Sequence, residues 1–403
     1  MKSARNWGRL GMKSEWYVST IDDVCLLVTD GAHNSPPSVE NGEYMASVKD
    51  FAEYGFDFST CKRISSEDYS KLEKQGCVPN IGDVLVGKDG ARYFEDIVIY
   101  KQPERPALLS SIAILRVNPE IITSEFLYYT LKSPAVKKDV RDNYGSGSAI
   151  PRIVLKDFKR MPIRYPSIED QRKITLIFEA IDAKIDLNNR INDNLEQQVK
   201  ALFLNYYNQS TTEVRFTDLI QILGGGTPKT SEISYWNGKI PLFTPKDVGN
   251  PYTLNTEKSI TEAGLDHCNS RLFPVNTVFV TARGTVGKVA LAGVPMAMNQ
   301  SCYALIGKDI HQILVYFYTL KAVERLKYKA SGAVFDAIIT KDFEMENLKT
   351  LSNSATEDFI VKAEPVYQLI LNNTIENQRL GKLRDTLLPQ LMSGELDVSA
   401  VEL

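Results

Sequence analysis

The chain contains two copies of one sequence pattern, and the second follows the first at an offset of roughly 190 residues. Thr130-Leu131-Lys132 recurs as Thr319-Leu320-Lys321, and Leu187-Asn188-Asn189 recurs as Leu371-Asn372-Asn373. Further matches, in the same order in both halves, pair 147–158 with 332–343, 78–86 with 273–280, and 169–170 with 357–358. This period is far longer than that of a solenoid repeat. The sequence therefore predicts two copies of one unit, each a domain followed by a helix.

Each copy divides into a mixed region and a long helix. The mixed regions hold short strand patterns punctuated by Gly, Pro and Asn, such as Asp83–Val86 and Thr277–Thr281, followed by a helix. We predict an N-terminal segment at 1–20, mixed α/β domains at 21–166 and 209–352, a first long helix at 167–208, and a second long helix with the C-terminal tail at 353–403. The predicted fold class is α+β, with the two duplicated domains separated by the two long helices.

Both long helices carry apolar residues at heptad spacing, which is typical of a coiled coil. In the first helix the two seam positions hold Phe178, Ile185, Asn192 and Val199, and Ile181, Asn188, Leu195 and Leu202. In the second helix the seam holds Phe359, Val366, Asn373, Leu380 and Leu387, joined by Leu369 and Leu383. Pro365 is expected to kink the second helix or to mark a late start. We predict an antiparallel coiled-coil spacer with a pseudo-two-fold axis; the alternative is that each helix packs only on its own domain.

The charge balance at first argues against nucleic-acid binding, because phosphate contacts need a basic surface. The 403 residues carry 47 Lys and Arg against 50 Asp and Glu, a net charge of −3. The charges are unevenly distributed, however. Residues 1–166 and 209–352 carry 38 basic and 35 acidic side chains, whereas 167–208 and 353–403 carry 9 and 15. The mixed domains are thus mildly basic, which is compatible with DNA binding but predicts that the chain does not bind DNA tightly alone.

Several other classes of protein are disfavoured by the sequence. No apolar run reaches the length of a membrane span, and the basic N-terminus lacks the apolar core of a signal peptide, so the expected compartment is the cytoplasm. The five cysteines and three histidines show no metal-ligand spacing, and the thiols are expected to be reduced. Arg283–Val289 lacks the spacing of a phosphate-binding loop, and no nucleophile elbow or zinc-protease motif is present. These absences favour a binding protein over an enzyme.

One family is recognisable from a set of short motifs in the second half of the chain. They are Gly224-Gly225-Gly226-Thr227-Pro228, Tyr235-Trp236-Asn237-Gly238, Ile240-Pro241, Thr244-Pro245-Lys246-Asp247, Arg283-Gly284-Thr285-Val286-Gly287-Lys288 and Asn299-Gln300. This region resembles a target recognition domain of the DNA specificity (S) subunits of type I restriction–modification enzymes. The first half resembles such a domain more loosely, through Asp30-Gly31-Ala32-His33, Gly82-Asp83-Val84-Leu85 and Gly145-Ser146-Gly147, with Lys88-Asp89-Gly90 where the second has Arg283-Gly284-Thr285. The C-terminal Leu387-Leu388-Pro389-Gln390-Leu391 and Ser393-Gly394-Glu395-Leu396 also look typical.

The resemblance implies a division of labour between chains. Each target recognition domain would read one half of a bipartite, asymmetric DNA sequence, and the helices would set the spacing between the halves and dock the methyltransferase (modification) subunits, expected to be two. The restriction/translocase subunits would be separate chains. No cofactor is expected in this chain; S-adenosylmethionine, ATP and Mg would belong to the partner subunits. The chain itself would be a non-catalytic part of the complex, without a metal site.

The candidate DNA-binding residues are polar side chains on loops, because base edges are read by hydrogen bonds. In the second domain they are Lys229, Thr230, Tyr235, Trp236, Lys246, Arg283, Thr285, Lys288, Asn299 and Gln300. In the first domain they are His33, Asn34, Lys49, Lys88, Arg92, Ser146, Ser148 and Arg152. Tyr235 and Trp236 fit loop packing as well. Candidates for phosphate contacts, with a solvated helix face as the alternative, are Lys137, Lys138, Arg141, Arg325, Lys327 and Lys329.

Two other functions stay open from the residues alone. The chain could be a stand-alone DNA methyltransferase or nuclease whose motifs are not evident, or a structural coiled-coil adaptor that does not touch DNA. Binding of S-adenosylmethionine by the isolated chain would favour the first, and absence of DNA binding in the presence of a methyltransferase partner would favour the second.

Overall fold

The computed structural model describes residues 15–52, 55–90, 92–145, 152–329 and 337–398. The chain forms two compact units. Unit 1 comprises residues 1–183 and 381–403, and unit 2 comprises residues 184–380. Each unit thus contains one mixed α/β region together with segments of both long helices.

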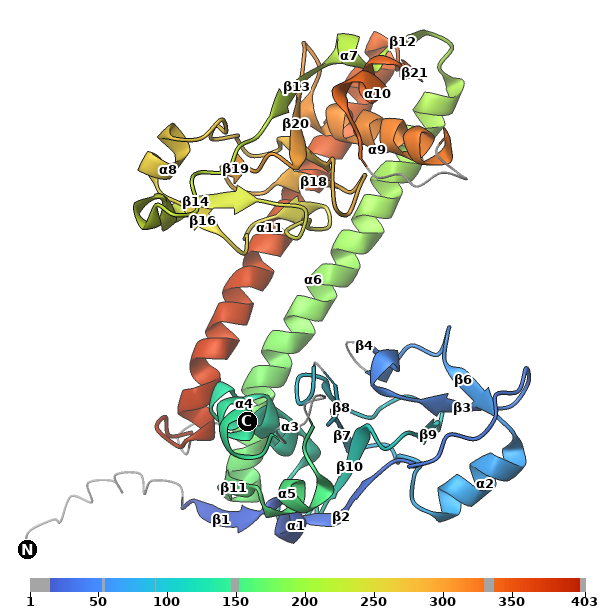
Figure 1. The fold of residues 1–403 in the computed structure, drawn as a ribbon, viewed down its shortest axis with the longest axis vertical. Helices are drawn as coiled ribbons and strands as arrows, with labels where there is room; N and C mark the ends of the chain where they lie inside the picture. The colour runs from blue at the N-terminus through green and yellow to red at the C-terminus, as the bar shows by residue number, and fades with distance from the viewer. Residues whose placement is uncertain (1–14, 53–54, 91, 146–151, 330–336, 399–403) are drawn as a thin grey trace, which may run out of the picture. The chain divides into compact units, whose positions relative to one another are not determined.

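Unit 1 is built around a four-stranded antiparallel sheet in the order β2-β10-β7-β8 (Figure 1). Its strands are β2 (Cys25–Asp30), β10 (Ile112–Val117), β7 (Val84–Gly87) and β8 (Ile97–Ile99). A second sheet, in the order β6-β3-β9, is formed by β6 (Lys62–Ile64), β3 (Glu43–Ala46) and β9 (Ala107–Leu108). Two-stranded sheets pair β1 (Tyr17–Thr20) with β11 (Pro162–Tyr165) and β4 (Phe51–Ala52) with β5 (Gly55–Phe56). The short helices are α1 (Ile21–Val24), η1 (Val48–Asp50), α2 (Ser66–Lys74), α3 (Ser124–Lys132), α4 (Pro134–Asn143) and α5 (Leu155–Arg160).

Unit 2 repeats this plan with an additional strand in its main sheet and, among the described residues, without a counterpart of the pair β4–β5 (Figure 1). Its five-stranded sheet has the order β13-β20-β17-β18-β15, from β13 (Ile220–Gly224), β20 (Cys302–Gly307), β17 (Val278–Thr281), β18 (Val289–Ala292) and β15 (Tyr252–Thr253). The second sheet has the order β16-β14-β19, from β16 (Ser259–Ile260), β14 (Trp236–Phe243) and β19 (Ala297–Met298), and β12 (Glu213–Arg215) pairs with β21 (Asn347–Lys349). The short helices are α7 (Phe216–Leu219), η2 (Ile233–Tyr235), α8 (Glu262–Asp266), α9 (Gln312–Lys329) and α10 (Thr340–Glu344).

The predicted duplication is confirmed strand by strand. The order β2-β10-β7-β8 matches β13-β20-β17-β18, and β6-β3-β9 matches β16-β14-β19, including one antiparallel and one parallel neighbour for the middle strand. The pair β1–β11 matches β12–β21. Only β15, which pairs in parallel with β18, has no counterpart in unit 1 among the described residues.

The main sheet of each unit is buried on both faces, and its strand sequences show why. In β7, Val84 and Val86 pack with α3 while Leu85, which points to the other face, packs in the core under the second sheet. In β17, Val278 and Val280 face the α9 side and Phe279 faces the second sheet. Because successive strand residues point to opposite faces, a strand covered on both sides reads as a continuous apolar run.

The two long helices are α6 (Ile168–Gln209) and α11 (Asn353–Met392), of 42 and 40 residues. Within unit 2 they pair through an amide network: Asn188 Nδ2 donates to Asn377 Oδ1 at 2.8 Å, and Asn373 Nδ2 donates to Asn192 Oδ1 at 2.8 Å. Asn188 Nδ2 also donates to Glu376 Oε2 at 2.7 Å. The partner numbers fall along α11 as they rise along α6, so the helices are antiparallel, as predicted. The alternative, that each helix packs only on its own domain, is wrong.

The burial of the helices confirms the seam predicted for α6 and corrects the seam predicted for α11. Of the eight seam residues in α6, five are buried and three, Ile185, Leu195 and Leu202, are half-buried. In α11 the predicted Leu369 and Leu383 are exposed instead. The buried positions of α11 are Phe359, Ala363, Tyr367, Ile370, Leu371, Leu388, Leu391 and Met392. The heptad reading of α11 was wrong at Leu369 and Leu383 because this helix also packs on its domain, which moves the apolar stripe away from a strict heptad.

The prediction of a late helix start at Pro365 is wrong, since α11 begins at Asn353. Pro365 is exposed on the solvent face of the helix. A proline there removes only the hydrogen bond to the carbonyl of Val361, which water can satisfy at an exposed site.

In unit 1 the ends of the long helices are joined by a different polar contact. Asp182 on α6 accepts a hydrogen bond from Tyr129 Oη at 2.8 Å and from Arg384 Nη1 of α11 at 2.8 Å. Burial, together with the neighbouring Asp182 carboxylate, raises the pKa of Tyr129 well above its ordinary value, so the phenol stays a donor at neutral pH. This carboxylate therefore ties α3, α6 and α11 together.

We expect the Asn192–Asn373 pair to fix the register of the two helices and to be less stabilising than a pair of leucines at the same positions. The single variants Asn192→Leu and Asn373→Leu should each destabilise the chain by about 1–3 kcal/mol, because one amide loses its partner in a largely buried seam. The double variant should recover this loss or exceed wild-type stability. A double-mutant cycle from chemical denaturation measures the coupling, with the exposed amide pair Asn194–Gln198 as the control. Simple additivity of the two single costs would contradict the assignment.

Candidate nucleic-acid interface

Four loops of unit 2 meet where strand β20, paired with β13 and β17, begins. They are residues 225–228 after β13, 244–247 after β14, 282–288 between β17 and β18, and 299–301 before β20. Backbone hydrogen bonds join them: Gly226 N donates to Met298 O at 2.9 Å, Asn299 N to Phe243 O at 2.9 Å, and Ala282 N to Ser301 O at 2.8 Å. Thr285 Oγ1 adds a hydrogen bond to Pro245 O at 3.1 Å. We call this group of loops the loop edge of unit 2.

The loop edge brings together side chains that the sequence predicted as readers of DNA. Lys246, Arg283, Thr285 and Gln300 all lie there and are exposed. Gln300 accepts a hydrogen bond from Thr227 Oγ1, which holds the amide over the first loop. Arg283 makes no ion pair with any residue that the structure describes, so its guanidinium is available to a ligand. An exposed set of Lys, Arg, Thr and Gln offers both donors and acceptors, as readout of base edges requires.

Unit 1 carries the same loop edge with the same backbone hydrogen bonds. Ala32 N donates to Leu108 O at 2.7 Å, Leu109 N to Ala46 O at 2.9 Å, and Lys88 N to Ser111 O at 2.8 Å. These are the bonds of Gly226, Asn299 and Ala282 in unit 2. In both units, moreover, a residue much later in the sequence, two positions before α5 or α10, donates to the first residue of the third loop: Ile153 N to Lys88 O at 3.0 Å, and Ile338 N to Ala282 O at 2.9 Å.

Two glycines explain how the first loop can lie so close to the strand end. A Cβ on Gly31 would stand 2.1 Å from Leu108 O, and one on Gly225 would stand 2.3 Å from Asn299 O. Both acceptors are backbone atoms that cannot move aside, so only glycine fits at either position.

The matched hydrogen bonds correct the sequence alignment of the third loop. The sequence paired Lys88 with Arg283, whereas the structure pairs Lys88 with Ala282 and Asp89 with Arg283. Gly90 and Gly284, with φ of 97° and 79°, then coincide as well. The error was one residue, and it arose because a basic residue was matched to a basic residue. The corrected pairing places opposite charges at the same point of the two loop edges.

Lys88 is buried, unlike the predicted readers on the loop edge of unit 2. Its ammonium lies 3.4 Å from Asp30 Oδ2 and 3.6 Å from Asp89 Oδ1, and only about 6% of the residue is exposed. His33 Nε2 lies 3.3 Å from the other oxygen of Asp30. Lys88 therefore neutralises carboxylates beneath the edge, while His33 and Asn34 line an open pocket of about 320 Å³ above it. In unit 2, Gly224 and Ala282 stand where Asp30 and Lys88 stand, and there is no such ion pair.

The other predicted residues divide between the loop edge and its surroundings. Lys49, Asn34 and Arg152 are exposed in unit 1, and Lys229, Thr230 and Lys288 in unit 2. Tyr235 stacks on His267 at 5.0 Å and Trp236 Nε1 donates to Lys229 O at 3.1 Å, so both aromatic rings hold a loop together. Asn299 accepts from Ser301 N at 3.0 Å within its turn. Ser146 and Ser148 lie outside the described residues.

The thiols near the edges are poor nucleophiles. Burial, with a smaller contribution from Asp247, raises the pKa of Cys302 to about 12, and burial with a smaller contribution from Asp50 raises that of Cys61 to about 11. Both stay protonated at neutral pH. All five cysteines are free. Within the described residues, moreover, no group of three or more His, Cys, Asp or Glu side chains could hold a metal ion.

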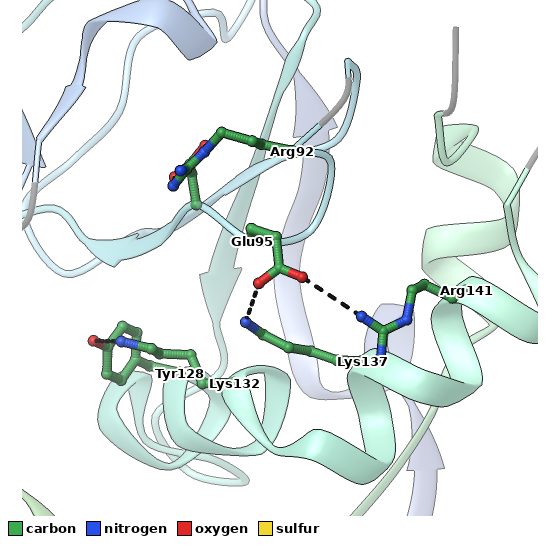
Figure 2. A network of polar contacts seen from close by, with 7 residues as sticks. Arg92, Glu95, Tyr128, Lys132, Lys137 and Arg141 are labelled. Carbon is green, nitrogen blue, oxygen red and sulfur yellow. Dashed lines mark hydrogen bonds and ion pairs between the residues drawn. The ribbon is translucent and has the colours of Figure 1, made fainter. Parts of the chain in front are cut away.

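In unit 1, carboxylates neutralise several cations that we proposed for phosphate contacts. Figure 2 shows Glu95 between Lys137 and Arg141, with its two oxygens 2.5 Å from Lys137 Nζ and 3.7 Å from Arg141 Nη1. Arg92, a predicted reader, pairs with Asp96 at 2.6 Å, and Lys132 donates to Tyr128 Oη at 2.7 Å. Exposed Lys138 makes no ion pair with any residue in the described ranges. It is the cation of α4 that remains free for phosphate.

In unit 2, a carboxylate likewise neutralises two cations of helix α9. The fully buried Glu346 accepts from Arg325 Nε at 3.1 Å and from Lys329. In unit 1 the apolar Met161 occupies the corresponding buried position. Arg325 and Lys329 therefore fasten α9 to the strand β21, whereas Lys327 lies beside Gly287 of the third loop.

Sequence reasoning missed two residues of the loop edge in unit 1. Ser110 stands where unit 2 has Gln300, and Asp89 stands where unit 2 has Arg283. Neither belongs to a recognisable motif. The signal that could have found them is the repeat itself, once the third loops are aligned on Gly90 and Gly284.

Comparison with known proteins decides the family. The model of the type I restriction modification DNA specificity domain matches residues 13–197 and 208–350, one match for each copy of the repeat. The chain belongs to this family. As the sequence suggested, it is a specificity protein with two such domains and paired long helices.

The relatives of this specificity protein match it along most of its length. It is 24% identical to the type I restriction enzyme MjaIX specificity subunit of Methanocaldococcus jannaschii, over 95% of this chain and 94% of that protein. It is 22% identical to the HindI specificity subunit of Haemophilus influenzae, over 70% and 80%. The type I restriction–modification S subunit from M. genitalium shares the fold, with a TM-score of 0.57, 15% identity and coverage of 95% and 97%. None of the described helices has an apolar stretch long enough to cross a membrane.

We expect Arg325 to act in stability rather than in DNA binding. Arg325→Gln should lower the free energy of unfolding by about 1 kcal/mol, because Glu346 keeps Lys329 but loses a charged partner. The dependence of DNA affinity on salt should not change. Thermal unfolding tests the stability role, with Lys327→Gln as the control that affects no ion pair among the described residues. A salt titration of DNA binding by the assembled complex tests the second expectation. A flatter salt dependence in Arg325→Gln would contradict the assignment.

Proposed function

We propose that this chain is the sequence-specific DNA-binding subunit of a type I restriction–modification complex. Each unit reads one half of a bipartite target through its loop edge, and the halves differ in sequence. The observation that carries this proposal is the pair of loop edges. They share their backbone hydrogen bonds but present different side chains, such as Asp89 against Arg283 and Ser110 against Gln300. A shared scaffold with different donors and acceptors is what two different half-sites require.

The chemistry of the complex belongs to partner chains. We propose that two methyltransferase subunits, using S-adenosylmethionine, dock on this protein, and that restriction/translocase subunits using ATP and Mg join them in the cytoplasm. Apolar side chains exposed on the long helices support docking there. They are Leu187, Ile191, Val361 and Leu369 in unit 2, and Leu176 and Leu383 in unit 1. Exposed apolar side chains that recur along a helix are typical of protein interfaces.

Mapping of adenine methylation tests the proposed function. Single-molecule sequencing of DNA from cells with and without this gene, in the presence of its methyltransferase partner, should reveal one gene-dependent motif with two dissimilar halves and a fixed gap. Gln300→Ser should relax or change one half only, and Ser110→Gln the other half only, because each lies on one loop edge. No gene-dependent motif would overturn the proposal. A change in both halves from either variant would contradict the assignment of one half to each unit.

The length of the helices should set the gap between the half-sites. A helix of 42 residues extends about 63 Å at ~1.5 Å per residue, and half-sites one DNA turn apart lie about 34–36 Å apart. Insertion of the same few residues into α6 and α11 should therefore lengthen the gap and leave both halves unchanged. The same insertion in one helix alone is the control, because it breaks the register of the Asn network. Methylation mapping that shows an unchanged gap in the double insertion would exclude a spacer role.

A further inference from the structure

The second loop of each edge contains the same short turn. In unit 1, Asp50 Oδ2 accepts from the backbone N and the Oγ of Ser47, at 2.8 and 2.9 Å. In unit 2, Asp247 Oδ2 accepts from the backbone N and the Oγ1 of Thr244, at 2.8 and 2.6 Å. Between the capped residue and the aspartate stand Val48-Lys49 in one unit and Pro245-Lys246 in the other. The turn thus presents a lysine at the same point of each loop edge.

Both lysines are exposed and available for a ligand. About 79% of the Lys246 side chain is exposed, and its one ion pair, with the exposed Glu257 at 3.5 Å, is of the kind that contributes little. Lys49 is exposed and makes no ion pair with any described residue. The carboxylate of each turn accepts from the backbone N–H and hydroxyl of Ser47 or Thr244, and it forms no ion pair with the lysine beside it.

These lysines differ from the other polar residues of the loop edges because the same residue stands at the matched position in both units. The residues at the other matched positions of the two edges differ: His33 stands against Thr227, Asp89 against Arg283, and Ser110 against Gln300. A side chain that is the same in both units cannot distinguish two different half-sites, whereas a phosphate is the same in every half-site. Repetition alone is not sufficient, because Lys156 and Lys341 also recur, on α5 and α10. The lysines of the turns differ from that pair in lying on the loop edge, beside the variable positions.

We propose that Lys49 and Lys246 are matched contacts to the phosphodiester backbone of DNA, one for each half of the target, and that they carry no sequence information. This inference rests on the proposed function. It divides each loop edge into a constant lysine that positions the unit on the duplex and variable residues that read bases. The ammonium of lysine is a compact, strongly hydrated charge on a flexible stem, which suits a phosphate oxygen better than a planar base edge.

The salt dependence of DNA binding by the assembled complex with its methyltransferase subunits tests the proposal. Lys49→Gln and Lys246→Gln should each lower affinity by the same factor for cognate and unrelated duplexes, and flatten the slope of log K against log salt by about 0.9; the double variant should flatten it by about 1.8. Lys49→Arg and Lys246→Arg should keep the wild-type slope. The methylation motif should stay unchanged in all of them.

Control variants lie at the far end of the central strands. In unit 1, Lys159 pairs with Asp22 at 3.1 Å near the start of β2, and in unit 2, Lys308 follows β20. The variants Lys159→Gln and Lys308→Gln each remove one charge from the unit of the matching test variant, away from its loop edge. These should leave the slope as in the wild type.

Two results would overturn the proposal. An unchanged slope in Lys49→Gln or Lys246→Gln would show a lysine that only meets solvent, and a loss confined to cognate DNA, or a changed base in one half of the motif, would show a base reader. Failure of the proposed function is distinguishable from both, because the wild-type complex would then show no gene-dependent motif at all.

Discussion

Each unit depends on one strand, β10 or β20, which is paired on both sides by antiparallel neighbours. Two loops of the candidate interface follow the neighbours of this strand in the main sheet, another follows the middle strand of the second sheet, and all of them meet the residues just before it begins. Because a slip of one residue would turn every side chain to the opposite face, the packed faces of the sheet fix this register. Core packing in strands such as β7 and β17 thus determines where the exposed residues proposed to read DNA stand.

The two edges show how one backbone accommodates different surfaces. Unit 1 buries Lys88 against Asp30 and Asp89, whereas unit 2 has Ala282 and Gly224 at the first two of these positions. A buried ion pair costs desolvation that its attraction barely offsets, so stability does not explain its presence. The Lys88 ammonium offsets the negative charge of Asp30 and Asp89 at this edge. It holds Asp89 directly, and it holds His33 through Asp30. Unit 2 has an exposed Arg283 at the position of Asp89 and needs no buried cation.

Sequence reasoning found what repetition and periodicity encode. The duplication, the two mixed domains, the seam of α6 with Asn188 and Asn192, and the loops bearing Lys246, Arg283 and Gln300 all followed from short motifs. It failed where tertiary contacts decide. Leu369 and Leu383 fit a heptad, but packing of α11 on its domain shifts the buried face. Lys88 looked like a reader because burial is not visible in a basic loop. Arg325 and Lys329 looked free because Glu346, distant from Arg325 in sequence, lies under them.

The same contacts explain why a net charge of −3 is a poor guide to this protein. Many of its cations are neutralised internally. Glu95 forms ion pairs with Lys137 and Arg141, and Glu346 forms ion pairs with Arg325 and Lys329. The cations that stay exposed without a strong partner include Lys49, Lys246 and Arg283, and these lie on the loop edges. Electrostatic attraction of DNA depends on the local field near the phosphates, which salt screens over about 8–10 Å, and not on the charge of the whole chain. A specificity protein whose carboxylates neutralise many of its other cations can therefore contact DNA at its loop edges without a generally basic surface.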